Sequence, residues 1–239
     1  MRGIAMGKKA ITEDSIIKID KSMQGYRVHA FFEDITGKTV SGWEMKPWLA
    51  AHEGKTIKEA VPFFLELSKR KNIKERLSEE RFNFISEADK SFITAFDKKI
   101  EKLGYDFGDG VGEGHCWGRY MIIYSKTGTK SKSVIARFFI RENGVVILRL
   151  FFNNIDKHRS YIENAPEHIK KVFTNDRGNC SCNPRNENCR FRKTYTLDGR
   201  QIEKCSWIVF EFKKPTLERL PHYMELLEEF YPNKKPKLS

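Results

Sequence analysis

Residues 86–103 have the most clearly specified secondary structure of this chain. Ser86 followed by Asp89 is typical of a helix N-cap, and Gly104 is suited to end the helix. Between these positions, apolar side chains recur every three or four residues, and this spacing predicts an amphipathic helix with one face on a hydrophobic core. The apolar residues are Phe92, Ile93, Phe96, Ile100 and Leu103.

The chain after this helix predicts an antiparallel sheet. Short runs rich in β-branched and aromatic residues alternate with turn residues, as in strands that are joined by hairpins. Such strands with helices beside them indicate an α+β fold, an antiparallel sheet covered by helices. We expect strands over residues 118–125, 134–140, 145–152, 191–197 and 203–212, and helices over 156–165, 166–173 and 216–230.

The first 80 residues predict a smaller α/β segment, either packed on residues 81–239 or separate from them. Residues 26–32 and 39–43 read as extended pieces because they are rich in aromatic and β-branched residues. Thr56 and Glu59 match a capping box, which predicts a helix over residues 57–71.

The dipeptide Asn143-Gly144 separates two predicted strands and is typical of a two-residue hairpin turn. That turn would place Phe139 opposite Leu148, and it would put Arg137 and Arg149 on opposite faces of the sheet. Neither face would be purely polar. We therefore expect the sheet to be covered on both sides or to line a pocket.

Arginine side chains lie among aromatic residues in this hairpin. Guanidinium groups beside aromatic rings are suited to hold a carboxylate or a phosphate. The alternative is that the arginines form ion pairs with acids on the covering helices, for example Glu163, Asp156 or Glu225. The predicted ligand-binding residues are Arg137, Phe139, Arg149 and Trp117.

The order of elements resembles a known group of domains. A helix is followed by the Gly/Trp turn Gly114-His115-Cys116-Trp117-Gly118, and then by a hairpin made of Arg137-Phe138-Phe139-Ile140 and Val145-Val146-Ile147-Leu148. With a further helix and a closing strand, residues 85–231 resemble the YdhG-like α+β domains of unknown function. The resemblance implies no catalytic residues, and this chain departs from it by an inserted cysteine loop over residues 178–205.

Four of the five cysteines gather around this loop. Cys180, Cys182 and Cys189 lie in the loop itself, and Cys205 lies on a predicted strand. Zinc prefers four such thiolate ligands, and a reducing compartment favours metal over disulfide. These residues therefore predict a structural zinc site. A disulfide and unrelated thiols remain alternatives, because Cys-x-Cys is a weaker signal than paired Cys-x2-Cys.

Positive charge is concentrated in the second half of the chain. Residues 1–110 carry 20 basic and 18 acidic side chains, whereas residues 111–239 carry 24 and 14. An excess of this kind attracts nucleic acid, anionic lipid or a phosphorylated small molecule, or it serves solubility alone. The basic residues around the cysteine loop, with Phe191 and Tyr195 as stacking residues, predict nucleic-acid binding as one alternative. The basic residues are Arg177, Arg185, Arg190, Arg192, Lys193, Arg200 and Lys204.

No apolar run approaches the roughly 20 residues that a membrane span needs, and no apolar stretch follows the N-terminal basic residues. We therefore expect a cytoplasmic protein with no membrane partner. The leading hypothesis is a binding module for an anionic small ligand, with a zinc-stabilised loop. Nucleic-acid binding and a thiol- or metal-dependent enzyme are the alternatives, and a non-enzymatic role is favoured.

Overall fold

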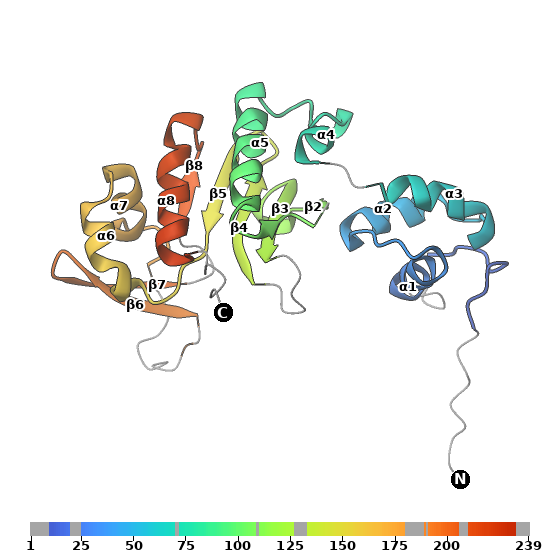
Figure 1. Cartoon of the computed structure of the whole chain (residues 1–239), viewed down its shortest axis with the longest axis horizontal. Helices are drawn as coiled ribbons and strands as arrows, with labels where there is room; N and C mark the ends of the chain where they lie inside the picture. Colours follow the sequence, from blue (N-terminus) through green and yellow to red (C-terminus); the bar gives the residue numbers. More distant parts are fainter. Residues whose placement is uncertain are drawn as a thin grey trace, which may run out of the picture. The chain divides into compact units, whose positions relative to one another are not determined.

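The computed structural model describes residues 10–19, 25–69, 72–108, 110–126, 133–179, 189, 191–205 and 210–232 (Figure 1). The chain divides into two compact units. The N-terminal unit comprises Met1–Asn72 with Asp109–Gly112, and the C-terminal unit comprises Ile73–Gly108 with Glu113–Ser239.

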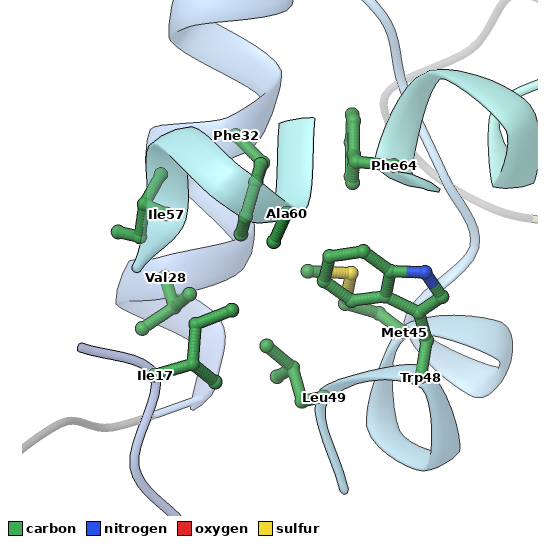
Figure 2. Packing of buried hydrophobic residues seen from close by; sticks show 9 residues of the cluster. All are labelled: Ile17, Val28, Phe32, Met45, Trp48, Leu49, Ile57, Ala60 and Phe64. Carbon is green, nitrogen blue, oxygen red and sulfur yellow. The ribbon is translucent and has the colours of Figure 1, made fainter. Parts of the chain in front are cut away.

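The described part of the N-terminal unit folds into helices around one core. The helices are α1 (Gly25–Thr36), α2 (Gly42–Ala51) and α3 (Ile57–Leu67). Phe32 stacks on Phe64 with ring centroids 4.9 Å apart, and Trp48 meets Phe32 edge-on at 5.2 Å (Figure 2). The predicted capping box is confirmed: Thr56 accepts a hydrogen bond from the Glu59 amide at 3.2 Å, and the Glu59 carboxylate accepts one from the Thr56 amide at 2.9 Å.

The extended pieces predicted in this unit are wrong. Residues 26–32 belong to α1, and residues 42 and 43 begin α2. Val28 and Phe32 are both buried in the core and lie four residues apart, which is the spacing of one helix face. Aromatic and β-branched residues prefer strands, but the packing of this helix face in the core outweighs that preference and residues 26–32 are helical.

The C-terminal unit confirms the α+β fold with an antiparallel sheet. Strands β1, β3, β4, β5 and β8 follow one another across the sheet, and β2 pairs with β3. These strands are β1 (Tyr105–Asp106), β3 (Tyr120–Lys126), β4 (Val134–Ile140), β5 (Val146–Leu150) and β8 (Glu211–Lys213), with β2 (Val111–Glu113), whose first two residues are counted in the N-terminal unit. The helices are α4 (Ile73–Leu77), α5 (Glu87–Glu101), α6 (Arg159–Asn164), α7 (Glu167–Thr174) and α8 (Leu220–Phe230), with short 3-10 helices η1 (Glu80–Phe82), η2 (His115–Trp117), η3 (Ile155–His158) and η4 (Leu217–Arg219).

One face of the sheet, the helical face, is covered by α5 and α8 (Figure 1). The Ser86 side chain caps α5 as predicted, accepting from the Asp89 amide at 3.1 Å. Phe96 on α5 meets Phe138 on β4 with ring centroids 5.1 Å apart, and Tyr223 on α8 meets Phe212 on β8 at 4.8 Å. The aromatic residues of the two helices therefore close this side of the core.

The hairpin of β4 and β5 has a three-residue loop instead of the predicted two-residue turn. The Arg141 amide donates to the Val145 carbonyl at 2.9 Å, and Gly144 has φ +77°, a left-handed conformation. The register is thereby shifted by one position, and Arg137 lies opposite Arg149. Because side chains alternate between the faces of a strand, this shift moves both arginines to the same face.

The predicted strand over residues 203–212 is divided between two sheets. Its first part is β7 (Arg200–Cys205), which pairs with β6 (Arg192–Leu197) in a separate hairpin and meets Asn179 in an isolated bridge at Lys204. Its last part is β8, which lies beside β5. The buried Tyr195 on β6 donates to the Phe173 carbonyl at 2.7 Å and so attaches the hairpin to α7.

Candidate functional site

The four predicted ligand-binding residues come together on the face of the sheet opposite α5 and α8, which we call the arginine face. Arg149 is opposite Arg137, and both lie beside Phe139 on neighbouring strand positions. The Arg149 guanidinium carbon is 4.3 Å from the centroid of the Trp117 ring and 4.6 Å from that of Phe139. The cation therefore lies against two aromatic rings at distances that are attractive.

Arg149 is buried, with an exposed fraction of 2%, and pairs with a carboxylate on the neighbouring strand. Its Nε donates to the Oε1 atom of Glu211 at 3.0 Å, and its terminal nitrogen reaches the same oxygen. Burial lowers the pKa of Arg149, and the hydrogen bond and charge of Glu211 oppose that shift. The partner is thus Glu211 on β8, instead of Glu163, Asp156 or Glu225 on the helices.

Glu211 also holds a second arginine. Arg177 Nε donates to Glu211 Oε2 at 2.9 Å, so each carboxylate oxygen faces a different guanidinium group. Glu211 itself is buried, whereas the Arg177 side chain is 41% exposed. The carboxylate thus links the interior arginine to one at the surface.

Arg137 has a different environment. Its Nε atom is buried without a hydrogen-bond partner among the described residues, and its guanidinium carbon lies 5.3 Å from the Phe151 ring centroid. Burial lowers the pKa of Arg137, and the positive charge of Arg149 lowers it further. Arg141 also acts electrostatically on Arg149. These arginines, with Arg177, bring four positive charges against the one carboxylate of Glu211.

The predicted zinc ligands are only partly within the described residues. Cys180 and Cys182 lie outside them, and Cys189 and Cys205 are half-buried free thiols. The Cys189 carbonyl accepts from the Arg192 amide at 3.0 Å, and Arg192 is paired across the hairpin with Cys205. In the part of the chain that the structure describes, no group of three possible metal ligands is present. The zinc site therefore stays a prediction.

Two of the described basic residues near this loop donate hydrogen bonds within the protein. Lys204 is buried, and its ammonium group donates to the carbonyls of Asn175 and Arg177. Lys193 donates to the Phe152 carbonyl at 2.9 Å. The predicted stacking role of Tyr195 is wrong, because its ring is buried in the core. Arg185 and Arg190 lie outside the described residues.

Several functional candidates were not identified from the sequence. Glu211 was not recognised as the partner of Arg149, since the two residues are 62 positions apart. His168 and His222 are also distant in sequence, yet the Nε2 atom of His168 lies 3.2 Å from the Nδ1 atom of His222. A correct register for β5 and β8 would have revealed the pair of Arg149 and Glu211. No local sequence pattern indicates the pair of His168 and His222.

No family model, curated protein or solved structure matches the chain. The resemblance to YdhG-like domains thus stays an expectation from element order. Among the described residues, no helix has both the length and the apolar character that crossing a membrane requires.

Proposed function

We propose that the protein binds a small anionic ligand, bearing a carboxylate or a phosphate, at Arg137 on the arginine face. The observation that carries the proposal is the buried Arg137 Nε atom, which lacks a hydrogen-bond partner among the described residues. A buried donor without a partner is costly, and an anion would satisfy it with a charge-assisted hydrogen bond.

The surrounding charges support the same proposal. Arg149 and Arg177 share the carboxylate of Glu211, which leaves the cluster with an excess of positive charge. Trp117 and Phe139 lie against Arg149 and limit its movement. We therefore assign Arg149 a positioning role and Arg137 the direct contact with the anion.

An Arg137→Gln variant tests this proposal. Calorimetric titration with citrate and with inorganic phosphate should show affinity lowered at least tenfold, because a hydrogen bond to a charged group contributes about 1.5–3 kcal/mol. The matched control is Arg200→Gln, which removes one positive charge from the exposed turn of β6 and β7 and should leave the affinity unchanged. Equal binding by both variants, or no binding by the unmodified protein, would refute the proposal.

The nucleic-acid alternative has a separate outcome in the same experiment. A short DNA duplex would bind with an affinity that falls by orders of magnitude between about 50 and 200 mM salt. Binding of this kind, retained in Arg137→Gln and without binding of the small anions, would favour that alternative.

A further inference from the structure

A cavity of about 420 Å³ lies between α7, β8 and the start of α8. Lys171 lies on α7, Lys213 on β8 and Arg219 at the end of η4, and all three line the cavity. The aromatic residues Tyr223 and Phe212 also line the cavity, and Tyr223 is 1% exposed. Cavities of this size commonly hold small organic ligands.

The lining of this cavity is strongly positive. Besides Lys171, Lys213 and Arg219 it includes Arg177, and Glu211 is its one carboxylate. Both Glu211 oxygens are already engaged by arginines, so they do not neutralise the other three cations. Among the described residues, Lys171 and Lys213 form no ion pair with an acidic side chain, whereas Arg219 interacts electrostatically with the adjacent Glu218.

Another cavity of the same unit is lined mainly by negatively charged residues. A larger cavity between α7 and the β6–β7 hairpin, of about 790 Å³, is lined by four carboxylates and two cations. Its acids are Glu167, Asp176, Asp198 and Glu203, and its cations are Lys170 and Arg200. The basic composition of the whole chain therefore does not by itself explain the charge of the cavity at β8.

The backbone of β8 beside this cavity also has uncharged hydrogen-bond donors. The Leu150 amide donates to the Phe210 carbonyl and the Lys214 amide to the Val146 carbonyl. In an antiparallel pair this pattern turns the amides of Glu211 and Lys213 away from β5, and both residues line the cavity. Backbone amides of this kind add hydrogen bonds to an anion without adding charge.

The histidine pair borders the same cavity. His168 lines it, and His222 on α8 lies against the His168 ring. Burial lowers the pKa of His168, and the charges of Arg219 and His222 lower it further. His168 is therefore mostly neutral at pH 7. Because its ring lines the cavity, its NMR signals should change when an anion binds there.

We propose that this cavity binds the phosphate group of a small phosphorylated molecule. Four cations around the one carboxylate of Glu211 suit a group that carries two negative charges, and guanidinium and ammonium groups both donate to phosphate oxygens. The volume leaves room for an organic part beside the phosphate. This site goes beyond the arginine-face proposal, because its defining residues, Lys171, Lys213 and Arg219, are not used there.

Calorimetric titration of the full chain with inorganic pyrophosphate tests the proposal. A double variant, Lys171→Gln with Arg219→Gln, should bind at least a hundredfold more weakly, because two charge-assisted contacts are removed. Arg200→Gln is the control: Arg200 is exposed and does not line this cavity, so the variant should bind pyrophosphate normally. Both substituted residues of the double variant are exposed, so its melting temperature should stay close to that of the unmodified protein.

Two further measurements complete the test. The NMR signals of His168 and His222 should shift on addition of pyrophosphate, which places the anion in this cavity. Vesicles that contain phosphatidic acid should bind no better than neutral vesicles, which distinguishes a free phosphorylated molecule from a lipid headgroup. Vesicle binding without pyrophosphate binding, unshifted histidine signals, or an equal loss in Arg200→Gln and in the double variant would overturn the proposal.

Discussion

Glu211 shows how a single buried carboxylate can organise a cationic region. Arg149 is buried and depends on Glu211 for its ion pair, while Arg177 reaches the other oxygen from the surface. Bringing these charges out of water is unfavourable unless they remain paired. The pair thus stabilises the fold only as long as both partners are present.

The Glu211→Gln substitution should lower the free energy of unfolding by about 3–5 kcal/mol, because it leaves the buried charge of Arg149 uncompensated. Urea denaturation at neutral pH measures the change. The control is Glu228→Gln, an exposed position on α8 where the change should stay within about 0.5 kcal/mol. A loss below about 1 kcal/mol at Glu211 would show that Arg149 does not need this partner.

Among the elements, the β4–β5 hairpin decides which side chains share a face. Its loop ends at Gly144, whose left-handed conformation allows the three-residue connection. A Cβ atom at Gly144 would meet the Phe84 carbonyl oxygen at 2.6 Å, so a side chain has no room there. The loop and its close contact thus fix the register that aligns Arg137 with Arg149.

Substitution of the loop glycine tests this account of the element. Gly144→Ala should destabilise the protein by about 1–2 kcal/mol from the left-handed backbone, and by about 1–3 kcal/mol more from the contact with Phe84. Gly199→Ala is the matched control: Gly199 has φ +71° but nothing within 4 Å of its Cβ position. Equal losses in thermal denaturation of the two variants would show that the contact with Phe84 is unimportant.

In the whole molecule, each compact unit has its own hydrophobic core. The core of the N-terminal unit contains Phe32 and Trp48, and that of the C-terminal unit contains Phe96 and Phe138 on the helical face. Units that bury separate cores can unfold separately.

Calorimetric unfolding should therefore show two transitions. Phe32→Ala and Phe96→Ala each remove a fully buried ring, at an expected cost of about 3–5 kcal/mol to the unit that contains it. Each variant should lower one transition temperature and leave the other in place. One cooperative transition, lowered alike by both substitutions, would contradict independent cores.

Helix caps and the buried face of α5 could be predicted from the sequence, because they depend on residues close to one another along the chain. Thr56 with Glu59, and Ser86 with Asp89, form helix caps over three residues, so their hydrogen bonds depend little on the rest of the molecule. The apolar spacing of α5 likewise predicted the buried face that carries Phe96. The α+β class followed from such local patterns.

Tertiary structure alone decided the features that join distant residues. Residues 26–32 form a helix because their apolar face packs into a core, and Arg149 meets Glu211 because β8 lies beside β5. The hairpin register depended on the loop at Gly144, and one position was enough to move Arg149 across the sheet. A cap needs only residues along one turn of chain, whereas a site on a sheet needs strands whose pairing is chosen by packing throughout the unit.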